Sequence, residues 1–127
     1  MAKLIYPELS YKIIGSAFEV FNSLGSGYQE KYYQKALAKE FQEKKIKFKE
    51  QVPININHKG INLGRYYFDF LVDDKILVEI KNSSKFYVRD IKQVLGYLKS
   101  KNLNLGLLIC FSKNGVIHKR ILRGNSR

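Results

Sequence analysis

The sequence contains little cysteine, few acidic residues and no long apolar run. A single cysteine, Cys110, excludes an internal disulfide and any zinc site built from several cysteines. Cys110 lies in the apolar segment 107–111, where a small buried side chain is expected rather than a nucleophile. No segment reaches the roughly 18 apolar residues of a membrane helix, and the first residues lack the apolar core of a signal peptide. We therefore expect a cytoplasmic protein without a membrane association.

The shortage of acids leaves a strong positive charge. The 23 Lys and Arg residues outnumber 11 Asp and Glu, for a formal net charge of +12 and an isoelectric point near 9.8. This balance favours a polyanionic partner, with nucleic acid as the first candidate. A surface charge that only keeps the protein soluble is the alternative, and an anionic membrane surface fits less well. At 127 residues, 45% of them hydrophobic, the chain is expected to form one domain over residues 1–127.

Hydrophobic spacing predicts the order ααβββαββ. Apolar residues at helical spacing indicate helices over residues 9–24, ended by Gly25, and over residues 28–44. From Phe48 to Ile56 the period changes to two, with one largely apolar face, and Pro53 suggests an edge strand or a bulge. The remaining elements are strands over 65–72 and 76–81, a helix over 88–100, strands over 105–111 and 116–122, and a basic tail carrying His118, Lys119, Arg120, Arg123 and Arg127. This order predicts an α/β fold with a central mixed sheet flanked by helices.

Two acids and a lysine interrupt the apolar strands of the hairpin. Side chains alternate along a strand, so Glu79 and Lys81 share one face. Charges in an apolar strand cost desolvation energy unless they pair or bind something, and the same holds for Asp69. If residues 73–75 form a three-residue loop, counting back along the hairpin places Asp69 directly opposite Glu79.

Opposed carboxylates destabilise a sheet unless a cation lies between them. A ligand set of the Asp69 and Glu79 carboxylates, the backbone carbonyl of Ile80 and water suits magnesium, or alternatively manganese, rather than zinc. Lys81 would then orient or deprotonate the attacking water, or stabilise charge on a phosphate. The alternative is that both acids are exposed edge residues paired with nearby lysines.

In this order, the residues resemble the PD-(D/E)xK nuclease superfamily: an acid on one strand of a hairpin, then Glu-x-Lys on the next, after a helix bearing another acid. More narrowly, the segment 27–33 with Gly27, Glu30 and Tyr33 is similar to the small bacterial GxxExxY proteins. The resemblance implies a restriction-endonuclease-like core and metal-dependent hydrolysis of phosphodiester bonds. DNA is favoured over RNA as the substrate by this analogy only.

The resemblance also implies roles for single residues. Asp69 and Glu79 would bind metal, Lys81 would be the catalytic lysine, and Glu30 would add the helix acid that often joins the site. Gln93, with Tyr97 one turn later, matches a helical glutamine that lines the site in many members. A helix N-terminal acid favoured by the macrodipole is the other interpretation of Glu30, and a solvated helix face is that of Gln93.

Some residues depart from the family pattern or lie outside it. Phe68 replaces the proline of the superfamily name, and Phe21 stands where many small relatives have a histidine. Tyr33 could orient Glu30, although an aromatic residue at this spacing is more often core. His58 and His118 are expected at the surface.

Two alternatives to an independent nuclease remain open. One is a nucleic-acid-binding module with weak or absent catalysis, and the other is a subunit that cuts only within a larger complex. No base-reading motif is evident, so sequence specificity would have to come from loops, a homodimer or a partner protein.

Overall fold

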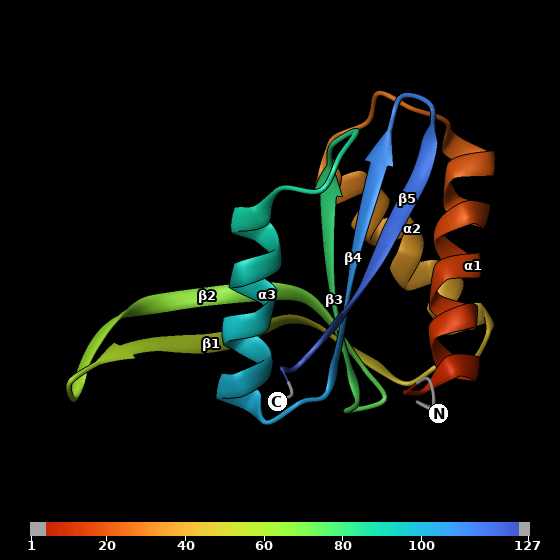
Figure 1. Cartoon of the computed structure of the whole chain (residues 1–127). Helices are drawn as coiled ribbons and strands as arrows, with labels where there is room; N and C mark the ends of the chain where they lie inside the picture. The colour runs from red at the N-terminus through yellow and green to blue at the C-terminus, as the bar shows by residue number, and fades with distance from the viewer. Residues whose placement is uncertain (1–4, 125–127) are drawn as a thin grey trace.

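The computed structural model describes residues 5–124, and its helices and strands follow the predicted order (Figure 1). The elements are α1 (Pro7–Leu24), α2 (Glu30–Glu43), β1 (Phe48–His58), β2 (Ile61–Val72), β3 (Ile76–Asn82), α3 (Val88–Lys101), β4 (Leu105–Ser112) and β5 (Gly115–Leu122). Gly25 ends α1 with a positive φ of 76°, which glycine adopts without steric cost. No helix within residues 5–124 is long and apolar enough to cross a membrane.

The five strands form one sheet in the order β1-β2-β3-β4-β5. Strands β3 and β4 are parallel and the other neighbours are antiparallel, which confirms the predicted mixed sheet. Because parallel strands need a crossover, α3 connects β3 to β4 across one face of the sheet. Helices α1 and α2 cover the opposite face (Figure 1). Pro53 lies in the edge strand β1, as predicted.

Each face of the sheet has its own apolar core. The α1–α2 core joins Ile13, Leu37 and Phe41 of the helices to Phe70, Val78 and Ile80 of the sheet. The α3 core joins Val94, Tyr97 and Leu98 of α3 to Val52, Phe68 and Leu77. Consecutive residues of β3 thus alternate between the two cores, as the period of two requires.

Strand β2 leaves β3 at Asp69. The two strands pair only from Val72↔Ile76 to Phe70↔Val78, which confirms the predicted register of the hairpin. Beyond Phe70, β2 pairs with β1 alone as far as His58↔Ile61. Residues 52–68 of this ribbon, which we call the arm, run past α3 and away from α1 and α2 (Figure 1).

The prediction that β1 keeps one apolar face is wrong. Phe48 packs against the α1–α2 core, whereas Val52 belongs to the α3 core. Gln51 lies between them with a positive φ of 49°, and neither it nor Asp69 pairs, although the ladder holds on both sides. A left-handed residue turns the ribbon, so the residues beyond it face α3.

Most predicted boundaries lie within two residues of those observed, but two further parts of the chain differ more. Strand β2 begins at Ile61 rather than residue 65, because the arm extends the ladder to a tight turn. His118, Lys119 and Arg120 lie within β5 instead of a tail, since β5 pairs with β4 through Leu122. Arg120 donates hydrogen bonds to the Ser10 hydroxyl at 2.7 Å and to the Ile5 carbonyl at 2.6 Å. Arg127 is outside the described residues.

Candidate active site

Asp69 and Glu79 meet where β2 separates from β3. The Asp69 carboxylate accepts a hydrogen bond of 2.7 Å from the Ile80 backbone N–H, which has no β2 partner there. In return, the Asp69 N–H donates to Glu79 Oε1 at 3.3 Å. Each carboxyl group therefore accepts a hydrogen bond from a backbone N–H that lacks a ladder partner where the strands separate, and the two carboxyl groups become neighbours.

Glu79 is buried, with only 4% of its surface exposed. The Tyr66 hydroxyl of the arm donates to its Oε2 atom. Burial and the adjacent Asp69 charge raise the pKa of Glu79 to about 8, against its ordinary 4.5. Burial and the Glu79 carboxyl also raise the pKa of Tyr66, so this phenol stays protonated and holds the carboxyl group in place.

Asp69 is half-buried, and its carboxyl group also lies close to other negative charges. Its pKa is raised by burial and by the negative charge of Glu30, against the opposing hydrogen bond from the Ile80 N–H. Two adjacent acids with raised pKa values indicate an unbalanced negative site, which is typical of functional sites. A cation bound between them would reverse both shifts.

Lys81 lies between two acids on the same side of β3. Its Nζ atom is 3.7 Å from Glu79 Oε2 and 3.9 Å from Asp90 Oδ1. Asp90 is buried in the first turn of α3, and Arg89 lies 3.9 Å from the same carboxylate oxygen. The crossover helix therefore supplies a carboxylate that holds the lysine beside Glu79.

Gln93 and Tyr97 of α3 border this site. The Gln93 amide donates a 3.0 Å hydrogen bond to the Tyr97 hydroxyl. The Tyr97 ring stacks on Tyr66 at a centroid distance of 5.0 Å and meets the Phe68 ring edge-on at 4.2 Å. Gln93 is therefore connected to Glu79 by the stacked rings of Tyr97 and Tyr66. Phe68 is a packing residue of the α3 core.

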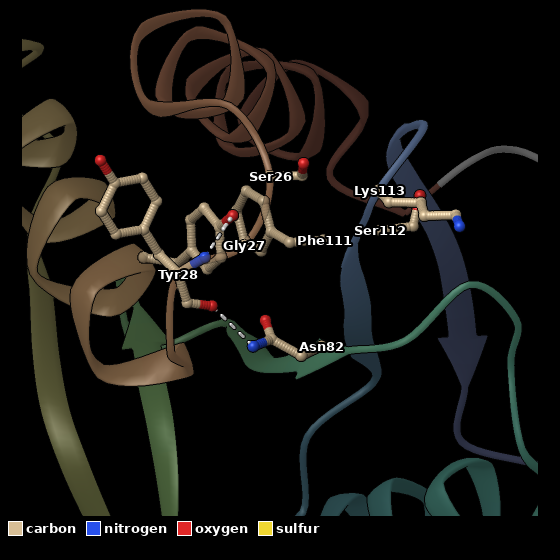
Figure 2. A pocket seen from close by; sticks show the side chains of 8 residues that line it. Ser26, Gly27, Tyr28, Asn82, Phe111, Ser112 and Lys113 are labelled. Carbon is tan, nitrogen blue, oxygen red and sulfur yellow. Dashed lines mark hydrogen bonds between the residues drawn. The ribbon is translucent and has the colours of Figure 1, made fainter.

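Glu30 lies at the end of β3, at the start of α2. Its Oε2 atom accepts a hydrogen bond from the Asn82 N–H at 3.2 Å, while the Asn82 side chain donates to the Tyr28 carbonyl at 2.8 Å. Figure 2 shows the latter bond in a pocket of about 280 Å³ between the α1–α2 loop and the ends of β3 and β4. Glu30 is exposed, but its charge still influences the pKa of Asp69.

Other sequence candidates have structural positions. Tyr33 is buried, stacks on Phe111 at 4.2 Å and donates to the Gly25 carbonyl at 2.7 Å, so it belongs to the core. Cys110 is buried, and burial raises the pKa of its thiol to about 11. His58 and His118 are exposed, as predicted.

The donor set can be tested against a divalent metal. Within residues 5–124, no three His, Cys, Asp or Glu side chains lie close enough together to hold an ion, so Glu30 does not form a three-acid cluster with Asp69 and Glu79. Magnesium, however, is commonly bound by one or two carboxylates and several waters. The Asp69–Glu79 pair has this composition. Because the N–H and C=O of a strand residue point to the same side, the Ile80 carbonyl faces Asp69 as well.

Sequence reasoning missed two residues of this site. The contact of Tyr66 with Glu79 could not be predicted from residue spacing, because it depends on the turn of the ribbon at Gln51. Asp90 could have been noticed as an acid in an otherwise basic helix segment, Arg89 to Lys101, directly after the hairpin. Its meeting with Lys81 requires the path of the crossover, which spacing does not reveal.

A family model described as the PD-(D/E)XK nuclease superfamily matches residues 7–123. The chain therefore belongs to the PD-(D/E)XK nuclease superfamily. No curated protein matches it significantly.

Two solved structures are similar in fold. SSO0001 is 15% identical with a TM-score of 0.59, over 95% of this chain and 61% of that one. The alkaline exonuclease LHK-Exo of Laribacter hongkongensis is also 15% identical, with a TM-score of 0.51, over 91% of this chain and 82% of the exonuclease. The chain thus spans about three fifths of the length of SSO0001. Both similarities bear out the predicted restriction-endonuclease-like mixed sheet flanked by helices.

Proposed function

We propose that this chain is a metal-dependent nuclease that hydrolyses phosphodiester bonds, with DNA favoured as the substrate. The observation that carries the proposal is the pairing of Asp69 with buried Glu79, with Lys81 3.7 Å from the latter. Superfamily membership supports the reaction class. The similar fold of an alkaline exonuclease agrees with it, although that similarity concerns structure alone.

Asp69, Glu79 and the Ile80 carbonyl are the proposed ligands of Mg²⁺ or Mn²⁺, and Glu30 is the proposed further acid. The metal would lower the pKa of water and polarise the phosphate. Tyr66 and the Asp69 N–H hold the two oxygens of Glu79, which fixes the carboxylate before any ligand arrives. Such pre-organisation reduces the reorganisation that the reaction requires.

Lys81 is the proposed catalytic cation. Two carboxylates restrain its ammonium group, that of Asp90 in α3 and that of Glu79 in β3. From there it can stabilise the charge that grows on a phosphate oxygen, or orient the attacking water. Gln93, held by Tyr97, is the proposed polar residue at the border of the site.

We also propose four narrower properties of the chain. They are a single domain over residues 1–127, membership of the GxxExxY group, a cytoplasmic location, and a homodimer or a partner protein that helps the chain act on both strands. Exposed lysines on many elements support nucleic-acid binding through the phosphate backbone.

The test is cleavage of labelled single-stranded, duplex and branched DNA and of RNA by wild type and Glu79→Gln. Each reaction is run with Mg²⁺, with Mn²⁺ and with EDTA. Cutting that requires metal and disappears in Glu79→Gln supports the nuclease and identifies its substrate. Binding without cutting on every substrate would instead favour the binding module, or the subunit that cuts only in a complex.

A further inference from the structure

A groove lies beside the candidate active site, between α3 and the outer edge of β1. Its volume is about 470 Å³, and it is lined by residues 54–57 of β1 and by Lys92, Gln93, Gly96, Tyr97 and Ser100 of α3. Because β1 is the first strand of the sheet, the outer edge of its backbone has N–H and C=O groups without a strand partner. The groove therefore combines an apolar floor with polar backbone along one wall.

One end of the groove reaches the candidate catalytic residues. Gln93 and Tyr97 line it, and they are joined by the 3.0 Å hydrogen bond. Tyr97 stacks on Tyr66, whose hydroxyl group contacts Glu79. Two side chains, Tyr97 and Tyr66, therefore link the groove to the buried Glu79.

The charges around the groove fit a polyanion. Lys92 is the single charged residue that lines it. The stretch from Gln51 to Phe68, which includes the arm, contains no Asp or Glu but has Lys59 and Arg65. Lys99 follows Lys92 by about two helical turns, so both lie on the same side of α3.

Gly96 keeps the groove open. A glycine inside a helix costs about 1 kcal/mol relative to alanine. Packing does not require it, because a side-chain carbon at this position would meet no atom within 4 Å. An empty position in the middle of the groove wall allows close approach of a ligand.

We propose that the groove holds a single strand of nucleic acid next to the phosphodiester bond on which the site acts. This inference rests on the proposed function and specifies the form of its substrate. A volume of about 470 Å³ is that of a small-ligand pocket, which suits one or two nucleotides and not a double helix. Lys92 and the β1 edge would bind phosphates, while Ile54, Ile56 and Tyr97 would contact bases.

The experiment measures binding separately from cleavage. Fluorescence anisotropy with a labelled single-stranded oligonucleotide is recorded in EDTA for wild type, Gly96→Leu, Lys92→Glu and the control Lys35→Glu. Lys35 is exposed on α2, on the opposite face of the sheet, and its reversal changes the net charge equally. Gly96→Leu raises helix propensity, so its fold should be retained, and thermal melting checks this.

We expect Gly96→Leu to weaken single-strand binding about tenfold, the loss of roughly one stacked base. Lys92→Glu should lower the slope of log Kd against log salt by about 0.7, and Lys35→Glu should alter it less. Hydrolysis of the small substrate bis(p-nitrophenyl) phosphate with Mn²⁺ should be equal in wild type and the control Lys35→Glu.

The outcomes separate the two claims. If Gly96→Leu weakens binding of the strand but wild type cuts no substrate, the groove is supported and the proposed nuclease activity is contradicted. Equal binding of the strand by wild type and Gly96→Leu overturns the groove even if wild type cuts. The groove proposal is also overturned if Gly96→Leu changes the oligomeric mass but not the binding of the strand. The groove would then accept a β-strand from a second copy of the chain.

Discussion

The two faces of the sheet bury different kinds of polar side chain. Within residues 5–124, the buried polar side chains on the α1–α2 side are Ser10 and Ser16, whose hydroxyls donate hydrogen bonds to the carbonyls of Tyr6 and Lys12. On the α3 side, the buried polar residues are Glu79 and Asp90, both carboxyl groups. The α1–α2 face thus buries neutral hydroxyl groups, whereas the α3 face buries carboxyl groups beside Lys81, at a higher desolvation cost. This difference supports the proposal that the α3 face holds the catalytic residues, while the α1–α2 core contributes to stability alone.

The largest expected effect tests the chemistry of the α3 face. Glu79→Gln and Asp69→Asn should each reduce metal-dependent cleavage by about a thousandfold, because each removes a negative charge from the proposed metal site. At pH 8 and above, their melting temperatures without metal should equal or exceed that of wild type, since a buried negative charge is lost. Initial cleavage rates and thermal melts measure both effects. Cleavage at the wild-type rate in either variant would remove that carboxylate from the mechanism.

The matching test of the α1–α2 core is Phe41→Ala. Phe41 is fully buried, with Phe48 and Phe70 edge-on at 5.5 and 5.2 Å. Its loss should cost about 3–5 kcal/mol of unfolding free energy through lost burial and a cavity. Urea denaturation measures this, and cleavage per folded molecule should change little. A fall in cleavage without a loss of stability would break the division between the two faces.

The pH dependence of stability should belong to the α3 face. Between its ordinary pKa of 4.5 and its folded pKa of about 8, Glu79 keeps a proton in the folded chain that the unfolded chain has lost. Stability in EDTA should therefore fall as the pH rises through this window, and the raised pKa of Asp69 acts in the same direction. Melting temperatures from pH 4 to 9 measure this dependence. Glu79→Gln should flatten it; an equally steep dependence in that variant would place its origin elsewhere.

Metal should reverse this penalty at the high end of the window. At about 100 times its Kd, a bound ion stabilises the folded state by about 2.7 kcal/mol. Melting temperatures at pH 8 with added Mg²⁺ or Mn²⁺ should therefore rise in wild type. The control is Phe41→Ala, whose site is intact and whose melting temperature should rise as well. A similar rise in Glu79→Gln would show that the ion binds at another site.

A smaller effect concerns the positioning of Lys81. Asp90→Asn removes one of the two carboxylates near its ammonium group and should lower kcat about tenfold, with a smaller change in KM. Asp90→Glu should restore part of the loss, because it restores the charge. Steady-state cleavage kinetics measure both variants. If neither substitution affected kcat, the contribution of Asp90 would be to packing alone.

The smallest effect tests the turn of the ribbon that brings Tyr66 to Glu79. Gln51→Gly relieves a left-handed backbone but gives the unfolded chain more freedom, so stability should change by less than about 1 kcal/mol. The matched control, Lys49→Gly, lies in the regular part of β1 and should destabilise the chain. Urea denaturation compares the two. A greater loss in Gln51→Gly than in Lys49→Gly would contradict the role assigned to the left-handed turn.

The local pattern of residues was sufficient for much of the fold. Helical spacing located three helices, and the three-residue loop placed Val72 opposite Ile76 in the observed register. These features depend on neighbours in the chain, so periodicity and turn chemistry predict them. Resemblance to a nuclease superfamily was confirmed over residues 7–123, while the roles of Asp69, Glu79, Lys81, Glu30 and Gln93 stay predictions.

By itself, the sequence determined the order of elements, the hairpin register and the placement of an acid and a lysine on one side of β3. Only the tertiary structure decided how β2 parts from β3, because that depends on the turn at Gln51 and the packing of the arm on α3. The contacts of Tyr66 with Glu79 and of Asp90 with Lys81 follow from this packing. They join residues from separate elements, and spacing along a chain carries no information about how far apart such elements lie in space.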